Sequence, residues 1–237
     1  MYIKLSSCHN IIILLQCLNH ADTLIEINRS VVWPDGAYAL PKSTWGCPTG
    51  WQSGYTDQDT ENALWNKNEK SPGIQSKMAV TVDRNHIIFW YCVKTSKDNI
   101  LPIPWPKGSY CIAKAKNANC PGGFQTGSIH WDDYDFFNKN KKWGEVPDGT
   151  YGHDTTVKYC CRNDGNSFTP MILPTSKPFV LYRYGGKCQS VKGMRSTPLY
   201  IKWDDNNVIN RDTCSGAHPD TTCKVDQHLH FCYYNKT

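Results

Sequence analysis

The chain has 237 residues, of which 39% are hydrophobic, 12% are aromatic and 20% are charged, and its formal net charge is +5. This length and apolar content argue against disorder and allow a substantial core, and an all-β body of this size forms a single domain. Because the charge is mild and no block of Lys or Arg approaches a nucleic-acid-binding arm, we do not expect nucleic-acid binding.

Residues 1–23 are predicted to be a cleaved export signal. Lys4 stands before a short apolar run over residues 11–18, which Gln16 interrupts. The run is too short for a bilayer-spanning helix, which needs about 20 apolar residues. We therefore expect a secreted, extracellular protein with no membrane span and one domain over residues 24–237.

Residue patterns recur along the chain at an interval of 72 or 73 positions. Trp33-Pro34 returns as Trp105-Pro106, and Trp131-Asp132-Asp133 returns as Trp203-Asp204-Asp205, each 72 positions later. Self-similarity at one interval indicates one structural unit built several times. We predict three pseudo-repeats, which cover about residues 31–93, 100–165 and 170–235.

The clearest predicted strands lie near the end of each pseudo-repeat. Residues 77–82 and 86–93 are rich in β-formers and are joined by the turn formers Asp83-Arg84-Asn85, which predicts a hairpin. Residues 155–160 and 226–232 alternate as half-buried strands do.

Helical signals are few. The best helical window, residues 59–67, is short, and proline clusters at 102–106 and 170–178 exclude helix interiors and central strands. The predicted fold is all-β, a disulfide-rich, β-sandwich-like body built from the three pseudo-repeats.

Cysteine spacing predicts a set of disulfides. Ten of the twelve cysteines follow the leader, and an even number in an exported chain indicates disulfide bonds. Each pseudo-repeat opens and closes with one cysteine, so we pair these within repeats and pair the others with one another. The predicted pairs are Cys47 with Cys92, Cys120 with Cys160, Cys188 with Cys232, Cys111 with Cys161, and Cys214 with Cys223. The adjacent Cys160 and Cys161 are interchangeable in this scheme.

Several ordered motifs resemble the ApeC domain, the C-terminal domain of apextrin, over about residues 31–235. The motifs are Trp33-Pro34-x-Gly36-x-Tyr38, Cys47-Pro48-x-Gly50-Trp51, Trp105-Pro106-x-Gly108-x-Tyr110-Cys111, Cys120-Pro121-x-Gly123-Phe124, Arg183-Tyr184-Gly185-Gly186-x-Cys188 and Gly216-x-His218-Pro219-Asp220. The resemblance implies a secreted invertebrate protein of innate immunity or extracellular matrix. Some relatives recognise peptidoglycan and aggregate bacteria, while apextrin is linked to apical matrix and cell adhesion. It implies no agreed set of ligand residues.

The two Trp-Asp-Asp segments are the strongest candidates for a ligand site. An aromatic face packs against a sugar ring, and carboxylate or amide groups bind its hydroxyls. The candidate residues are His130, Trp131, Asp132, Asp133, Asp135, Trp203, Asp204, Asp205 and Asn206. Two other interpretations stay open. The carboxylates could bind Ca²⁺, or the repeated Trp-Asp pair could be a core tryptophan beside a carboxylate that caps backbone amides.

Three weaker patterns favour structural roles. His228-x-His230 places two imidazoles on one face of a strand without a third ligand, Phe89-Trp90-Tyr91 is typical of a core strand, and Lys139 to Lys142 is typical of a solvated loop. Asn28, in Asn28-Arg29-Ser30, is the predicted glycosylation acceptor.

The sequence and the resemblance together predict a secreted, lectin-like recognition protein that binds bacterial cell-wall glycans such as peptidoglycan or lipopolysaccharide. Agglutination of bacteria would need at least two sites per particle, either in one chain or through self-association. An extracellular-matrix or cell-adhesion protein is the alternative, and a glycan-degrading hydrolase is a second. We predict no enzyme and no resident cofactor, because the chain lacks a nucleophile elbow, a His-Glu-x-x-His motif and a phosphate-binding glycine loop.

Overall fold

The computed structural model describes residues 31–60, 67–95, 102–133, 139–204, 210–224 and 226–236. The chain divides into two units, Met1–Val32 and Trp33–Thr237, and all strands belong to the second. The predicted export signal and the glycosylation acceptor Asn28 lie outside the described residues.

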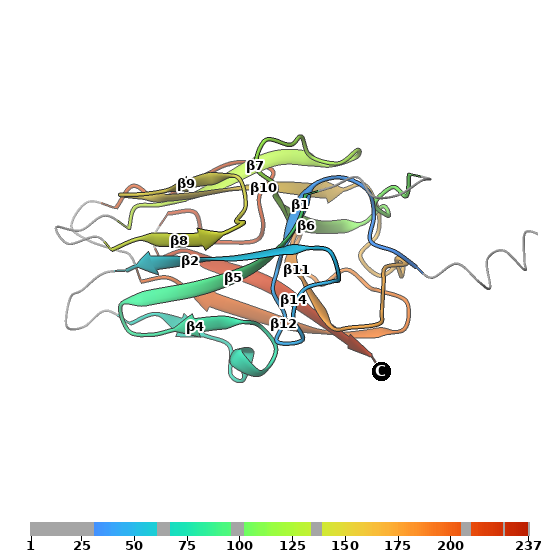
Figure 1. Cartoon of the computed structure of the whole chain (residues 1–237), viewed down its shortest axis with the longest axis horizontal. Coiled ribbons are helices and arrows are strands. Elements are labelled where there is room, and N and C mark those ends of the chain that lie inside the picture. Colours follow the sequence, from blue (N-terminus) through green and yellow to red (C-terminus); the bar gives the residue numbers. More distant parts are fainter. Residues whose placement is uncertain are drawn as a thin grey trace, which may run out of the picture. The chain divides into compact units, whose positions relative to one another are not determined.

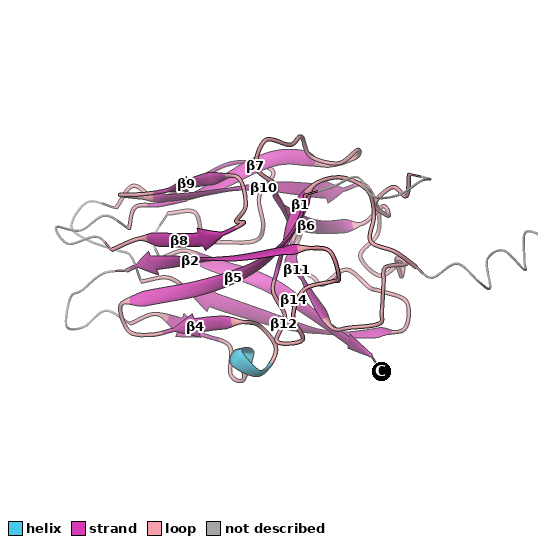
Figure 2. Cartoon of the chain, in the orientation of Figure 1, coloured by secondary structure: helices cyan, strands magenta, loops and turns pink. Residues whose placement is uncertain are grey.

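The regular secondary structure of the described part is almost entirely β-strand, as predicted (Figure 2). The first segment contains β1 (Tyr38–Pro41), β2 (Gln52–Asp59), β3 (Glu69–Lys70), the 3₁₀ turn η1 (Ile74–Ser76), β4 (Val80–Val82) and β5 (His86–Lys94). The second contains β6 (Ser109–Lys114), β7 (Gln125–Trp131), β8 (Lys141–Gly144), β9 (Gly149–Tyr151) and β10 (Thr155–Asn163). The third contains β11 (Phe179–Arg183), β12 (Met194–Lys202), β13 (Thr213–Gly216) and β14 (His228–Lys236).

The 14 strands form one hydrogen-bonded sheet with antiparallel pairing (Figure 1). Within each segment the last strand pairs with both the first and the second strand: β5 with β1 and β2, β10 with β6 and β7, and β14 with β11 and β12. The second strand of each segment also pairs with a strand of another segment. The pairs are β2 of the first segment with β8 of the second, β7 of the second with β13 of the third, and β12 of the third with β3 of the first. The pairing order is therefore the same in the three segments, while the internal repeat itself stays a prediction from the sequence.

The predicted hairpin is confirmed as β4 and β5, which pair from Val80 opposite Phe89 to Val82 opposite Ile87. The predicted helical window is wrong at its start. Asp59 is the last residue of β2, where residues 52–59 alternate between the two faces of the sheet. Residues 61–66 of that window lie outside the described part.

The first strand of each segment is buried on both faces. In β1, Ala39 packs into one hydrophobic cluster and Tyr38 and Leu40 pack into another. In β6, Ala113 packs into the same cluster as Ala39, and Ile112 packs into the same cluster as Tyr38 and Leu40. Strands buried on both faces have continuous apolar sequences instead of alternating ones. These central strands, visible in the middle of Figure 1, separate the two clusters of the core.

Five disulfides link the cysteines in the predicted pairs. They join Cys47 to Cys92, Cys111 to Cys161, Cys120 to Cys160, Cys188 to Cys232, and Cys214 to Cys223. Four of them close loops with sequence separations of 40 to 50, and each contributes about 4 kcal/mol in the chain-entropy account.

The choice between Cys160 and Cys161 follows from strand geometry. Neighbouring residues of a strand point to opposite faces. In β10, Cys161 faces the cluster that contains Cys111, which lies directly opposite on β6, whereas Cys160 faces the other cluster, against which Cys120 packs.

Candidate functional site

The two tryptophans of the Trp-Asp-Asp segments lie in the core. Trp131 ends β7, Trp203 follows β12, and their side chains are only 1% and 2% exposed. Their ring centroids are 5.5 Å apart, and Trp203 Nε1 donates a hydrogen bond to Gln58 Oε1 at 3.1 Å. A sugar ring cannot reach these indoles. The packing of the segments against one another covers both rings, so the structure favours the interpretation of Trp131 and Trp203 as core tryptophans over the predicted glycan platform.

Asp133 is also buried, with 5% of its surface exposed. Its carboxyl group accepts hydrogen bonds from Thr155 Oγ1 at 2.7 Å, Asn140 Nδ2 at 3.1 Å and Gln58 Nε2 at 3.2 Å. Burial raises the pKa of Asp133 to about 7, against the opposing effect of these donors. Together with Trp203 and Gln58, Asp133 forms a hydrogen-bonded network that joins residues of all three segments.

The first aspartate of each Trp-Asp-Asp motif forms hydrogen bonds with another of the three strand-containing segments. Asp132 N donates to Asp212 Oδ1 at 2.9 Å, and Arg211 N donates to Asp132 Oδ2 at 2.8 Å. We call such an arrangement a reciprocal pair, because each partner supplies one amide donor and one side-chain acceptor. It fixes the end of β7 to the segment that contains β13.

Two further reciprocal pairs have the same form. In one, Asp204 N donates to Asn68 Oδ1 at 2.9 Å and Lys67 N donates to Asp204 Oδ2 at 2.6 Å. In the other, Asp59 N donates to Asn140 Oδ1 at 2.7 Å and Lys139 N donates to Asp59 Oδ2 at 2.9 Å. The three pairs link the first segment to the second, the second to the third and the third to the first, so their main role is structural.

The described carboxylates of the two segments thus accept protein hydrogen bonds. His130, the remaining described candidate, has its Nδ1 2.9 Å from Thr156 Oγ1 on the neighbouring strand β10. The candidates Asp135, Asp205 and Asn206 lie outside the described residues.

Replacing Asp204 by alanine removes the acceptor of the Lys67 amide. We expect the free energy of unfolding to fall by about 0.5–1.5 kcal/mol, because an exposed amide loses a charged hydrogen-bond acceptor and water takes its place. Denaturant titration with intact disulfides measures the change. Glu145→Ala, which removes an exposed carboxylate, is the control and should stay within about 0.5 kcal/mol. Equal effects of the two substitutions would contradict the structural role of the pair.

A partly exposed row of aromatic side chains lies on the outer face of β5, β2 and β8. Tyr55 lies directly opposite Trp90 on one side and Trp143 on the other. The Tyr55 ring centroid is 4.8 Å from that of Trp90 and 6.1 Å from that of Trp143, on which it stacks. Trp143 is 60% exposed. We call Trp90, Tyr55 and Trp143 the aromatic row; the three strands that carry it lie side by side in Figure 1.

A lysine lies at the Trp90 end of the aromatic row. Lys42 Nζ lies 4.8 Å from the centroid of the Trp90 ring and 3.2 Å from Ser53 Oγ, to which it donates. Ser53 Oγ in turn donates to the Tyr91 carbonyl oxygen at 3.4 Å. The ammonium is therefore held over the indole face, where it adds a cation–π contact and a hydrogen-bond donor beside the apolar surface.

Strand alternation separates Trp90 from its neighbours. Phe89 and Tyr91 are buried, as predicted for a core strand, but Trp90 points to the other face of β5 and is half-buried. The local pattern of three consecutive aromatics could not show this. Alternation within each strand is the signal that would have separated outer from inner positions. Tyr55 and Asp57 are two residues apart on β2, and Ile88 and Trp90 are two residues apart on β5, so each pair shares one face.

The aromatic row occurs once. The corresponding positions on β10, β7 and β13 carry Lys158, Ser128 and Ser215, which lie opposite one another in register. On β14 and β12 the corresponding pair is His230 and Tyr200. The described part of the chain therefore presents one row of three aromatic side chains, and its other two equivalent faces are chemically different.

The two histidines of β14 do not form a metal centre with a third described ligand. The rings of His228 and His230 have centroids 4.5 Å apart, and Tyr200 packs against His228 at 4.6 Å. Burial, with a smaller contribution from Arg183, lowers the pKa of His230 to about 4. Burial also lowers the pKa of His228. Both imidazoles are therefore neutral at neutral pH.

Among the described residues, no helix is both long and apolar enough to cross a membrane.

A family model described as ApeC, the C-terminal domain of apextrin, matches residues 33–234. No curated protein and no solved structure matches the chain. The family match covers all 14 strands except the last two residues of β14.

Proposed function

Because the chain belongs to the ApeC family, the family of the C-terminal domain of apextrin, we propose that it is a secreted recognition protein that binds microbial surface glycans such as peptidoglycan or lipopolysaccharide. The proposed action is binding without catalysis. Five disulfides support an extracellular location, because such bonds persist in oxidising compartments. An exposed aromatic surface supports the glycan as ligand.

The aromatic row is the observation that carries this proposal. Amphipathic sugar rings present C–H groups on their faces and hydroxyls on their rims, so they stack on indole and phenol rings and hydrogen-bond at the edges. Tyr55 and Trp143 present nearly parallel rings, with an interplanar angle of 24°. Lys42 offers a cation at the other end, suited to a carboxylate or phosphate of a bacterial glycopolymer. The row crosses three strands, which gives room for more than one sugar ring.

Trp143→Ala is expected to weaken sedimentation of the protein with insoluble peptidoglycan. Loss of one stacking indole costs about 1–2 kcal/mol of binding free energy, or about 5- to 30-fold in affinity. Trp45→Ala is the matched control, because Trp45 is 63% exposed against 60% for Trp143 but lies outside the aromatic row. Equal loss in the two variants, or binding unchanged in Trp143→Ala, would refute the assignment of the row.

A panel of binding partners tests the ligand class. The protein is incubated with peptidoglycan, lipopolysaccharide and host matrix, each with and without a chelator. Binding to peptidoglycan or lipopolysaccharide supports the proposal, whereas exclusive binding to matrix would replace it with an adhesion role. Loss of binding in chelator would add calcium to the site, and release of soluble fragments from labelled peptidoglycan would show a hydrolase.

The described part of the chain carries one aromatic row, and this has a consequence for agglutination. A particle that crosslinks bacteria needs at least two sites. A chain with one row binds a surface but does not join two of them, so agglutination by this protein should require self-association. Agglutinating activity that persists in strictly monomeric fractions would contradict a single site.

A further inference from the structure

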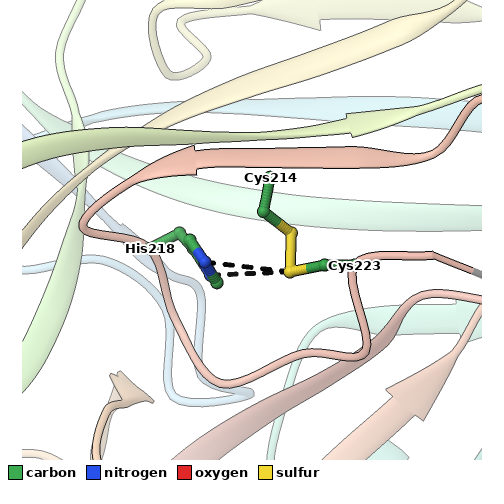
Figure 3. A group of neighbouring side chains, drawn as sticks. All are labelled: Cys214, His218 and Cys223. Atoms are coloured by element: carbon green, nitrogen blue, oxygen red, sulfur yellow. Dashed lines mark hydrogen bonds between the residues drawn. A yellow bond between two sulfur atoms is a disulfide. The ribbon is translucent and has the colours of Figure 1, made fainter.

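A half-buried cluster of two cysteines and a histidine lies after β13 (Figure 3). Cys214 belongs to β13 and is bonded to Cys223, at a sequence separation of 9. His218, from the loop between them, points toward the disulfide and places its Nε2 3.7 Å from Cys223 Sγ. The imidazole nitrogen and the two sulfur atoms all lie within 4.8 Å of one another.

We propose that the Cys214–Cys223 disulfide is reducible by a dithiol while the other four bonds stay closed, and that the resulting thiolates bind Zn²⁺ together with His218. The site would be a Cys₂His zinc site with a fourth position open to water. This inference is independent of glycan binding, because the cluster shares no residue with the aromatic row.

Accessibility distinguishes this disulfide from the other four. Each of those contains at least one cysteine that is nearly or completely buried: Cys92, Cys111, Cys161, Cys160 and Cys232 are 0–3% exposed. Cys214 and Cys223 are both only partly buried. Thiol–disulfide exchange requires the attacking thiolate to reach a sulfur atom. Cys47, Cys120 and Cys188 are partly buried too, so their bonds offer one accessible side each, whereas the Cys214–Cys223 bond can be attacked at either sulfur.

The backbone and the histidine both favour exchange. Cys223 has a φ of 62°, in the left-handed region that is unfavourable for a residue with a Cβ atom. When a dithiol thiolate attacks Cys214 Sγ, Cys223 leaves as a thiolate whose Sγ lies 3.7 Å from the polar imidazole of His218. The second thiol of the reagent then attacks the mixed disulfide and releases Cys214. The balance is one dithiol oxidised to its cyclic disulfide and one protein disulfide reduced to two thiols, with two electrons transferred.

The imidazole is already oriented as a zinc ligand. His218 Nδ1 lies 2.9 Å from the Pro219 carbonyl oxygen, which can only accept, so Nδ1 carries the proton and donates it. This leaves the Nε2 lone pair directed toward sulfur. Histidines that bind metals commonly donate their other ring N–H to a backbone carbonyl in this way.

The required ligand spacing is close to that already present. Tetrahedral zinc with Zn–S near 2.3 Å and Zn–N near 2.0–2.1 Å separates ligand atoms by roughly 3.6–3.8 Å. The Nε2 to Cys223 Sγ distance of 3.7 Å meets this spacing without rearrangement. After reduction the two sulfur atoms must move apart, and Cys214 Sγ, which starts within 4.8 Å of the imidazole nitrogen, must take the third ligand position. Zinc binding then displaces the two thiol protons.

Stepwise reduction tests the first half of the proposal. The full chain is treated anaerobically with increasing dithiothreitol, alkylated and mapped by peptide mass spectrometry. Cys214 and Cys223 should be labelled at a dithiothreitol concentration at least about tenfold below that needed for the other eight cysteines. Labelling of another pair at the same or a lower concentration would overturn the proposal.

Cobalt titration tests the second half. Protein reduced at that one bond should bind one equivalent of Co²⁺ with a thiolate-to-cobalt absorption band, and Zn²⁺ should displace it. His218→Gln should weaken Co²⁺ binding by more than the roughly 10- to 100-fold that loss of an outer-shell partner costs. His153→Gln, at an exposed histidine, and unreduced wild-type protein are the controls. Absence of the band, or equal affinity in His218→Gln, would show that no such site forms.

Discussion

Trp203→Ala is expected to lower the free energy of unfolding by about 4–6 kcal/mol. Truncation of a buried Trp to Ala costs about 3–5 kcal/mol, since it removes apolar contacts and leaves a cavity. The substitution also leaves Gln58 Oε1, which accepts from the indole N–H, without that donor in the core. Small domains are stable by only about 5–15 kcal/mol, so the variant should lie close to unfolding.

Guanidinium titration with intact disulfides measures this loss. Trp45→Ala is the matched control, because it removes the same side chain from an exposed position and should change stability by no more than about 0.5 kcal/mol. Trp203→Phe keeps most of the packing and removes only the N–H donor, so its loss should be about 1–3 kcal/mol. A fully stable Trp203→Ala protein that has lost glycan binding would restore the ligand role that the buried position argues against.

Asp133 is expected to make the protein less stable as the pH rises from about 4 to about 7. Its pKa is about 7 in the folded state and near 3.8 when unfolded, because burial disfavours the charged carboxylate. In this interval the folded state holds a proton that the unfolded state has released, so stability falls with increasing pH. A difference of about three pKa units corresponds to roughly 4 kcal/mol. Above pH 7 this contribution no longer changes.

His230 acts in the opposite direction over part of the same interval. Its folded pKa of about 4 lies below the usual 6.5, so protonation of the unfolded chain removes stability as the pH falls from about 6.5 to about 4. The two groups partly cancel in the wild-type protein. Single substitutions are therefore needed to separate them.

Unfolding free energies measured from pH 4.5 to pH 7.5 should resolve the two contributions. Asp133→Asn removes the titrating carboxyl group, so the stability of this variant should rise with pH more steeply than that of the wild type. His230→Gln removes one opposing contribution while His228, whose pKa burial also lowers, still titrates, so the stability of that variant should fall with pH relative to that of the wild type. Identical pH profiles for the wild type and Asp133→Asn would show that the carboxyl group titrates as it does in water.

The sequence carried more information about covalent links and strands than about the site. The pairs Cys47–Cys92, Cys188–Cys232 and Cys214–Cys223 followed from the spacing of ten cysteines, because a bond that closes each segment leaves few combinations. The partners of Cys111 and Cys120 were narrowed to the adjacent Cys160 and Cys161, and the two faces of β10 decided between them. The hairpin of β4 and β5 followed from local alternation and turn residues. The Trp-Asp-Asp segments were correctly singled out as special, but their chemistry alone does not distinguish a sugar platform from a core indole.

By itself the sequence determined the all-β class, the family and the cysteine pairs apart from the choice between Cys160 and Cys161, since these depend on local patterns and spacing along the chain. Only the tertiary structure decided which aromatic side chains face water. Trp131 and Trp203 are buried because the ends of β7 and β12 pack against each other, whereas Tyr55, Trp90 and Trp143 meet because β2 pairs with β5 on one side and β8 on the other. Exposure and alignment across strands arise from such contacts between distant parts of the chain, which local patterns do not record.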